Sequence, residues 1–246
     1  GKNRIVHHKD VTGLEIEQKL LIQIGKTRNI SILDHHFAID LITEHHLETE
    51  LVPDKRTCYG AYILDVKSGE IEPILSKITM LASGGLGQVY AHTTNPLVAT
   101  GDGIAMAYRA QAKICEIEYI QFHPTALYLP EESPSFLISE AVRGEGAHLI
   151  TKSGERFMSK YDNRLELASR DIVAKAIDNE LKISGDNCVY LDCKHLNIED
   201  FKNHFPNIYE KCLSIGINIE INEIPVVPAV HYSCGGVAVD SNGHTS

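Results

Sequence analysis

Two histidines, two arginines and a glutamate stand at positions where their side chains could bind a small anion. His123 precedes a proline, and a residue before proline is restricted to an extended backbone, which fixes the direction of its imidazole. His231 lies on an apolar stretch just before a glycine pair, which permits close approach of the backbone. Each histidine taken alone is more often structural. Together with Glu140, Arg143 and Arg170, these residue types predict a pocket for a dicarboxylate.

Arg170 falls at the start of a predicted helix, with Ser169 as its N-cap. A cation at the first helical position opposes the helix dipole, at a cost of about 0.3–1 kcal/mol. Either Asp171 neutralises this cation, or the field makes the guanidinium a readier proton donor and an anchor for a carboxylate. Glu140 and Arg143 lie three residues apart on one helix face, either as a functional pair or as a surface ion pair.

A glycine turn precedes another predicted helix. The turn contains Ser83, Gly84 and Gly85, and its missing Cβ atoms would let a planar or phosphate-bearing ligand touch the backbone. A tight turn between two elements explains the same glycines equally well, and the sequence contains no GxGxxG motif. Asp102 begins the helix that follows, where its carboxylate would either cap the helix or accept a hydrogen bond from a ribose or ribitol hydroxyl.

Apolar periodicity predicts the elements that position these residues. Expected strands lie at 30–33, 37–43, 58–66, 71–75, 77–82 and 225–239, with a hairpin turn at 67–70. Expected helices lie at 12–25, 101–110, 135–143, 169–183 and 199–216. The helix at 169–183 would bury Ile172, Ala176, Ile177 and Leu181. This order of elements predicts an α+β unit inserted between two pieces of an α/β unit.

Composition excludes several classes of function. The 246 residues are 43% apolar, which predicts a soluble globular protein, and the net charge of −10 argues against a nucleic-acid partner. No apolar run approaches the roughly 20 residues of a membrane-spanning helix, so no membrane role is expected. Six cysteines form no CxxC pair, which predicts neither a zinc site nor a disulfide framework and favours a reducing cytoplasm. No metal site is expected from the three His-His pairs, because adjacent side chains point in different directions.

Six motifs in a fixed order resemble the succinate dehydrogenase, fumarate reductase and L-aspartate oxidase flavoprotein family. They are Ala82-Ser-Gly-Gly, Thr100-Gly-Asp-Gly, Gln121-Phe-His-Pro-Thr, Glu140-Ala-Val-Arg-Gly-Glu-Gly, Ser169-Arg-Asp-Ile-Val and His231-Tyr-Ser-Cys-Gly-Gly. The resemblance covers essentially the whole chain and is stronger to the aspartate oxidase branch. Ser169 is a departure, since aspartate oxidases often carry proline there. The pyrophosphate-binding GxGxxG and the C-terminal helical domain of the family have no counterpart in this sequence.

The resemblance implies a partial α/β, Rossmann-like FAD-binding domain with an inserted α+β capping domain. It divides the chain into residues 1–119 of the FAD-binding domain, residues 120–232 of the substrate-capping domain, and residues 233–246, which return to the FAD-binding domain. We therefore expect the middle portion of a longer enzyme, inactive by itself.

The implied reaction is the oxidation of L-aspartate to iminoaspartate by hydride transfer to FAD, on the route to quinolinate and NAD, with fumarate as another dicarboxylate ligand. The alternatives are a succinate dehydrogenase or fumarate reductase flavoprotein subunit and an inactive folded fragment. A cytoplasmic location and association with quinolinate synthase are also implied. By position, the expected substrate contacts are His123, Thr125, Ser139 and His231. Arg170 resembles the proton donor or acceptor, with Glu140 and Arg143 as its relay. The expected FAD contacts are Phe37, Ala38, Ser83, Gly84, Gly85 and Asp102.

Overall fold

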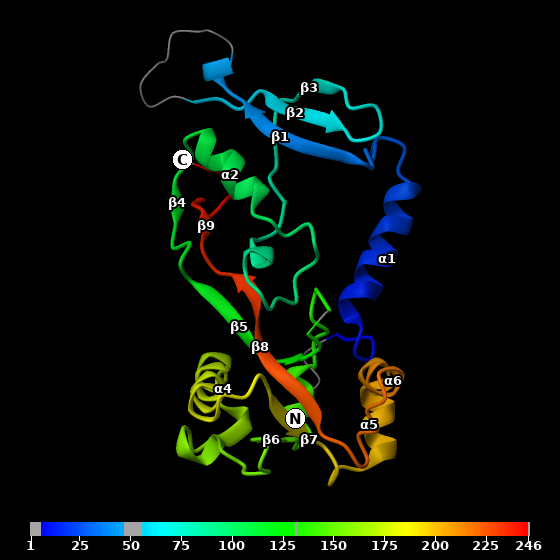
Figure 1. The fold of residues 1–246 in the computed structure, drawn as a ribbon. Helices are drawn as coiled ribbons and strands as arrows, with labels where there is room; N and C mark the ends of the chain where they lie inside the picture. The colour runs from blue at the N-terminus through cyan, green and yellow to red at the C-terminus, as the bar shows by residue number, and fades with distance from the viewer. Residues whose placement is uncertain (1–5, 47–55, 131, 246) are drawn as a thin grey trace. The chain divides into compact units, whose positions relative to one another are not determined.

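The computed structural model describes residues 6–46, 56–130 and 132–245 (Figure 1). The chain divides into two compact units. Unit 1 comprises Gly1–Ile30, Tyr90–Asn95 and Gln121–His231. Unit 2 comprises Ser31–Val89, Pro96–Ile120 and Tyr232–Ser246. Each unit is therefore assembled from segments that are distant in the sequence.

Unit 1 is built on a four-stranded sheet in the order β5-β8-β7-β6. Its strands are β5 (Ile120–Leu127), β6 (His148–Ile150), β7 (Val189–Asp192) and β8 (Ile224–Ser233). Its helices are α1 (Thr12–Gly25), α3 (Glu140–Gly144), α4 (Arg170–Ser184), α5 (Ile198–His204) and α6 (Pro206–Ser214). Figure 1 shows α4 on one side of these strands and α5 and α6 on the other. The apolar side chains of sheet and helices join in one buried core, which includes Leu191, Val226, Ile177 and Phe201.

Helix α4 agrees closely with the helix expected at 169–183. Ser169 occupies the N-cap position, and Gly185 ends the helix in a left-handed conformation with φ of 75°. Ala176 and Ile177 are fully buried, while Ile172 and Leu181 pack against the core from its edge. The helix is thus fixed by its apolar stripe, and its first residue is Arg170.

The single helix expected at 199–216 is wrong, because α5 and α6 are separate helices. Pro206 begins α6; it has no N–H and its ring clashes with a preceding helical turn, so the chain breaks at Phe205. Asp10 closes the new helix end, since its Oδ2 accepts hydrogen bonds from the backbone N–H groups of Asn207 and Ile208, both at 3.1 Å.

Helix α3 is shorter than the helix expected at 135–143. Leu137 instead forms a β-bridge with Ala126, and the N–H of Ile138 donates to the carbonyl of Thr125 at 3.0 Å. These bonds keep the segment extended until Ser139, whose Oγ accepts from the N–H of Ala141 at 3.2 Å and caps the helix. Pairing to β5 therefore overrides the local helical pattern.

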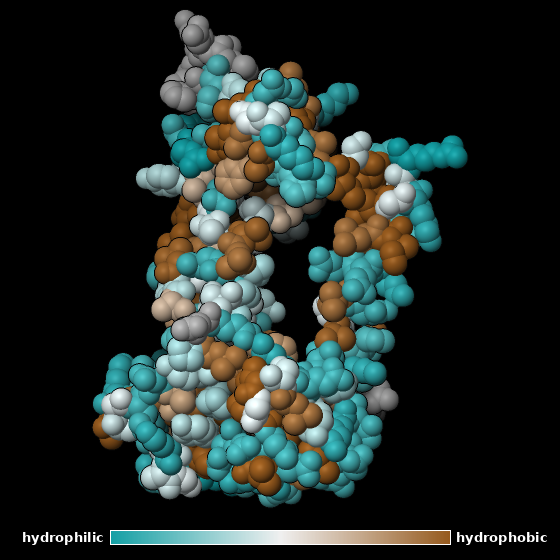
Figure 2. Space-filling view, turned by 45° about the vertical axis from the view of Figure 1, so that its right-hand side comes forward, coloured by the Kyte–Doolittle hydropathy of each residue, from teal (hydrophilic) through white to brown (hydrophobic). Residues whose placement is uncertain are grey.

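Helix α1 has the expected bounds, but its N-cap is Val11 and Thr12 already lies in the helix. None of its residues is buried. Leu14, Ile16, Leu20 and Leu21 are 52%, 55%, 58% and 52% exposed, and apolar side chains reach the surface along this helix (Figure 2). Among the described residues, no helix is long and apolar enough to cross a membrane.

Unit 2 contains an antiparallel sheet in the order β1-β2-β3. Its strands are β1 (His36–Ile42), β2 (Gly60–Asp65) and β3 (Ile71–Leu75), and the predicted hairpin turn at 67–70 joins the last two. Helix α2 (Asp102–Arg109) is tied to β1, because Arg109 Nε donates to Asp40 Oδ2 at 3.0 Å and its Nη2 donates to the carbonyl of Ile39 at 2.8 Å. Two short strands, β4 (Ile114–Cys115) and β9 (Gly236–Val237), pair antiparallel.

Three strand predictions need correction. Residues 30–33 form no strand, and residues 77–82 pair with none of the described strands. The segment before the glycine turn is also not buried, since Ile78 and Met80 are each 85% exposed. A strand requires a neighbouring strand for its backbone hydrogen bonds, and an apolar run alone does not supply one. The strand expected at 225–239 ends at Ser233, after which the glycine pair redirects the chain into β9.

Candidate functional site

The two predicted histidines lie side by side in unit 1. His123 is on β5 and His231 is near the end of β8, and these strands are neighbours in the sheet. Their ring centroids are 5.4 Å apart in an edge-to-face arrangement. His123 is only 1% exposed, while His231 is partly buried. The sheet therefore joins two residues that are far apart in the sequence.

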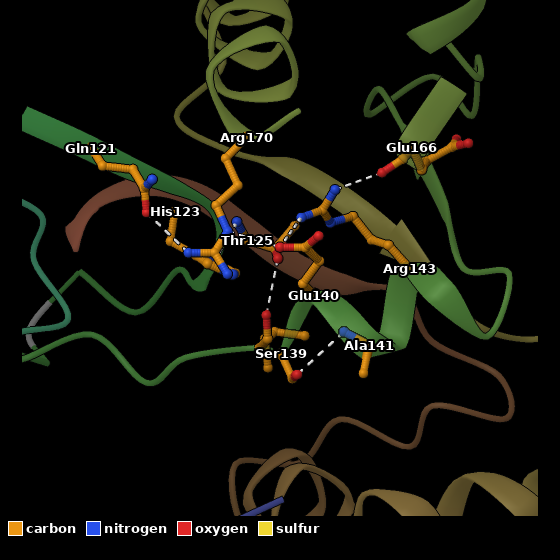
Figure 3. A network of polar contacts seen from close by, with 10 residues as sticks. Gln121, His123, Thr125, Ser139, Glu140, Ala141, Arg143, Glu166 and Arg170 are labelled. Atoms are coloured by element: carbon orange, nitrogen blue, oxygen red, sulfur yellow. Dashed lines mark hydrogen bonds and ion pairs between the residues drawn. The ribbon is translucent and has the colours of Figure 1, made fainter. Parts of the chain in front are cut away.

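Arg170 makes two side-chain hydrogen bonds from the first turn of α4 (Figure 3). Its Nε donates to Glu140 Oε2 at 2.8 Å, and its Nη1 donates to Gln121 Oε1 at 3.0 Å. The alternative partner, Asp171, is instead hydrogen-bonded by Ser169, which is the main cause of the lowered pKa of that carboxyl. The carboxylate that pairs with Arg170 is thus on α3.

Arg143 is buried, so Glu140 and Arg143 are not a surface ion pair. The side chain of Arg143 is 1% exposed, and its Nη1 donates to the backbone carbonyl of Glu166 at 2.5 Å. Its Nη2 lies 4.0 Å from Glu140 Oε2, and in the described structure its Nε and Nη2 make no hydrogen bond. Burial lowers the pKa of Arg143, Glu140 raises it, and Arg170 lowers it further. Glu140 therefore lies between two guanidinium groups, one buried and one partly exposed.

Both imidazoles are held neutral by their surroundings. Burial lowers the pKa of His123 to about 3, and the nearby charges of Arg170, His231 and Arg143 act in the same direction. Burial and Arg170 also lower the pKa of His231. The backbone N–H of Thr125 donates to His123 Nδ1 at 3.3 Å, so the single proton of neutral His123 resides on Nε2. Such an N–H group can donate to an incoming carboxylate.

Thr125 and Ser139 have structural partners close to these groups. Thr125 is fully buried, and its Oγ1 donates to the carbonyl of Ile138 at 3.0 Å. Its hydroxyl proton is therefore already used in a hydrogen bond to Ile138. Because the N–H of Thr125 donates to His123, Thr125 supports the imidazole. Ser139 Oγ accepts a bond as the cap of α3, which leaves its own hydroxyl proton for another acceptor. Their roles as substrate contacts stay predictions.

Gln121 is a member of the cluster that residue types alone do not identify. It lies on β5, two positions before His123, on the same side of the strand. Its amide oxygen accepts from Arg170, which fixes one edge of the guanidinium (Figure 3). The only signal in the sequence was its place inside a family motif, since glutamine is a common surface residue.

The glycine turn in unit 2 has two packing functions. A Cβ on Gly103 would lie 1.7 Å from Ser83 Oγ, and a Cβ on Gly85 would lie 2.6 Å from Ser233 Oγ. These glycines therefore let the turn approach the start of α2 and the end of β8. Gly84 has φ of 74°, and no heavy atom lies within 4 Å of the position of a Cβ. The backbone at Gly84 is open to a ligand.

The other predicted contacts of unit 2 lie on its sheet and helix. Asp102 begins α2 but does not cap it, because the N-cap is Gly101; its Oδ2 accepts from Thr100 Oγ1 at 2.5 Å. Phe37 and Ala38 lie on β1, an edge strand, opposite Leu64 and Ile63 of β2. Phe37 is 46% exposed. Within the described residues, no cluster of three or more His, Cys, Asp or Glu side chains could hold a metal ion.

Comparison with known proteins gives consistent matches along the chain. Residues 2–246 match the family model described as FAD binding domain. L-aspartate oxidase of Pseudomonas aeruginosa is 52% identical over 242 residues, which cover 98% of this chain and 44% of that protein. Chloroplastic L-aspartate oxidase of Oryza sativa is 50% identical over 252 residues, covering 99% of this chain and 38% of the relative. A solved quinol fumarate reductase variant of E. coli has a TM-score of 0.83 and 28% identity, covering 97% of this chain and 42% of its own. The chain thus spans less than half the length of the relatives it matches.

Proposed function

Because this chain belongs to the FAD-binding domain family, we propose that it is part of an enzyme that oxidises L-aspartate to iminoaspartate with FAD. The family membership and the mixed α/β fold agree with what the six motifs predicted. The observation that carries the proposal is the cluster of His123, His231 and Arg170, in which two neutral imidazoles lie near a guanidinium. The names of relatives that are about half identical to the chain support L-aspartate as the substrate.

The residues of unit 2 fit FAD, the cofactor of this family. No heavy atom lies within 4 Å of a Cβ position at Gly84, so a cofactor could approach the backbone of the turn there. Asp102 would accept a hydrogen bond from a hydroxyl of the nucleotide, in competition with Thr100. Main-chain groups of the edge strand at Phe37 and Ala38 would contact the adenine side. Bound FAD supplies the acceptor for the hydride that leaves the substrate Cα.

The residues of unit 1 would bind and orient the dicarboxylate. His123 and His231 would donate to its carboxylates, with Ser139 as a further donor, and the positive charge of Arg170 compensates the charge of the anion. These bonds would hold the substrate C–H in a fixed direction, which is the main contribution of positioning to the rate. Desolvation of the buried imidazole strengthens each such bond.

The two arginines and Glu140 would move a proton. Arg170 lies 2.8 Å from Glu140, and Glu140 lies 4.0 Å from Arg143. In the direction that reduces fumarate, Arg170 would protonate the substrate carbon and recover its proton through Glu140. The lowered pKa of the buried Arg143 eases its loss of a proton to Glu140.

The proposal is tested with the full-length protein and two substrates. L-aspartate should reduce the flavin and yield iminoaspartate, which hydrolyses to oxaloacetate and ammonia, whereas succinate should not. The structural likeness to fumarate reductase favours a succinate dehydrogenase or fumarate reductase subunit as the second candidate. Flavin reduction by succinate alone would reject the aspartate reaction in favour of that candidate.

We further assign the flavin to unit 2 and the dicarboxylate to unit 1. The boundaries at 119/120 and 232/233, the role of quinolinate synthase as a partner and the cytoplasmic location stay predictions, and one plant relative is named chloroplastic.

A further inference from the structure

A short polar loop holds the end of strand β8 by side-chain hydrogen bonds. Thr93 Oγ1 donates to the carbonyl of Val230 at 3.2 Å, and Asn95 Nδ2 donates to the carbonyl of His231 at 2.8 Å. Between them, Thr94 Oγ1 lies 2.8 Å from His231 Nδ1 and 3.2 Å from the carbonyl oxygen of Val230. The loop therefore contacts both the backbone and the imidazole of a residue proposed to bind substrate.

The count of donors around Val230 decides which way the Thr94 hydroxyl points. A carbonyl oxygen has two lone pairs. The oxygen of Val230 already accepts from the N–H of Thr94 at 2.9 Å and from the hydroxyl of Thr93 at 3.2 Å. Among the described hydrogen bonds, the Thr93 hydroxyl donates only to this carbonyl, while its own oxygen accepts from the N–H of Asn95. The Thr94 proton consequently goes to the shorter contact, His231 Nδ1.

We propose that Thr94 is a positioning residue that holds neutral His231 as the Nε2–H tautomer, so that Nε2 donates to a substrate carboxylate. This inference rests on the proposed function of the site and deepens it. It makes His231 equivalent to His123, whose Nδ1 accepts from the N–H of Thr125 and whose proton is therefore also on Nε2. Two imidazoles with Nε2–H groups, fixed by different neighbours, would together recognise the anionic ends of a dicarboxylate.

The surroundings of His231 favour its neutral form, and a neutral imidazole has only one N–H. The tautomer therefore decides which ring nitrogen can donate. Among the described neighbours of the ring are His123 from β5 and Arg170 from α4, and neither carries a negative charge. An imidazolium donates from both nitrogens, so Thr94 would not matter below the pKa of His231. Above that pKa the ring has one proton, and its position decides whether Nε2 donates to the substrate or accepts. The effect of Thr94 is therefore expected to depend on pH.

The tautomer can be read directly in the full-length holoenzyme. In protein labelled with ¹⁵N-histidine, the ring nitrogen shifts of His231, assigned by their loss in His231→Gln, should show a proton on Nε2 at neutral pH. Thr94→Val, which keeps the shape but removes the hydroxyl, should shift the ring toward a mixture of tautomers. An Nδ1–H tautomer in the unaltered protein would overturn the inference without reference to activity.

The consequence for binding is measured as the pH dependence of the KM for L-aspartate and of the Kd for succinate, a non-reacting dicarboxylate detected by the flavin absorbance. Thr94→Val should raise both constants about tenfold above the pKa of His231, as expected for a lost bond to a charged group, and leave them near normal below it. Thr94→Ser should restore binding. Thr27→Val, which removes a hydroxyl bonded to a carbonyl of α1, is the control.

The outcomes separate this inference from the proposed function. An equal rise in both constants at every pH, or no rescue by serine, would mean that Thr94 acts only on the fold. Unaltered protein that binds succinate but does not oxidise L-aspartate would reject the proposed reaction and keep the role of Thr94. If the unaltered protein binds no dicarboxylate, the proposed hydrogen bond from His231 Nε2 to a substrate carboxylate is overturned.

Discussion

At the scale of single residues, the planar guanidinium of Arg170 has two edges, and each has a different partner. Glu140 occupies one edge and Gln121 the other, at 2.8 and 3.0 Å. A lysine at this position is a point charge that cannot bridge both groups. The orientation of the proposed proton donor thus depends on two elements, α3 and β5, which meet the start of α4.

Replacement of Arg170 by leucine or lysine should reduce kcat by at least about 100-fold, because the proposed proton donor is lost or misdirected. Flavin content should stay normal, since the assigned flavin contacts are in unit 2. Steady-state reduction of fumarate and the flavin absorbance of the purified protein measure the two effects. Arg164→Leu, which removes an exposed arginine paired with Asp162, is the control. Normal turnover in Arg170→Leu would remove the proposed proton path.

His123 should make the fold sensitive to acid. Its pKa is about 3 in the folded protein and near 6.5 when unfolded, so between these values the unfolded chain binds more protons. Above the pKa of the unfolded state, this histidine does not reduce the free energy of unfolding. As the pH is lowered below that pKa, the free energy of unfolding falls by up to about 1.4 kcal/mol per pH unit because of this group. His123→Gln should flatten the loss in urea unfolding between about pH 7 and about pH 5. An unchanged slope would show that the imidazole becomes protonated without cost.

At the scale of elements, a buried carboxylate connects β6 to the segment before α4. Glu166 has a side chain that is 4% exposed; it accepts two bonds from Arg156, at 2.9 and 2.6 Å, and one from the N–H of Leu149 at 3.1 Å. Burial alone would raise the pKa of Glu166, but these bonds lower it. Its backbone carbonyl accepts from Arg143, so the same residue supports the proposed relay.

Removing Arg156 should destabilise the fold strongly, because a buried carboxylate would lose its cation. We expect Arg156→Ala to lower the free energy of unfolding by about 3 kcal/mol in a urea titration. The matched change Arg164→Ala should cost less than about 1 kcal/mol, because its ion pair with Asp162 is exposed to solvent. Equal effects of the two changes would show that burial of Glu166 adds nothing to the pair.

Elements were predicted well from the sequence where the features that define them lie within one segment of the chain. Helix α4 and the hairpin of β2 and β3 were predicted closely, because an apolar stripe, a cap or a turn is complete within each segment. The segments at 77–82 and 135–139 were assigned wrongly: residues 77–82 pair with none of the described strands, whereas residues 137 and 138 bond to β5. The short strand β6 has only three residues, and such a strand carries too little pattern to be recognised.

The same distinction holds for the candidate site. His123, Arg170 and His231 were predicted because their chemistry and motifs single them out, and the structure places the two histidines side by side. Gln121 and Thr94 contribute hydrogen bonds that exist only once β5, β8 and α4 are assembled. Their residue types are common on surfaces, so residue type alone did not identify them.

At the scale of the whole molecule, the two units differ in how much apolar surface they bury. Unit 1 has the large core shared by its sheet and helices. Among the described residues of unit 2, the buried apolar side chains are Leu41, Ile42, Ala99, Met106 and Ala107. Burial of apolar side chains is the dominant favourable contribution to folding, so the described residues of unit 2 supply less of it than those of unit 1. A cofactor bound to unit 2 would add to the stability of this unit, because it binds the folded state and not the unfolded one.

Removal of FAD from the full-length protein should loosen unit 2 selectively. Free ligand at 100 times its Kd stabilises the state that binds it by about 2.7 kcal/mol, so amides that exchange only when unit 2 opens should exchange about 100-fold faster in the apoprotein. Hydrogen exchange followed by mass spectrometry measures this in peptides from β1, β2 and α2. Peptides from β7 and α4 are the internal reference, because their protection depends on the core of unit 1. Equal acceleration in both sets would mean that the two units open together and that FAD stabilises them as one.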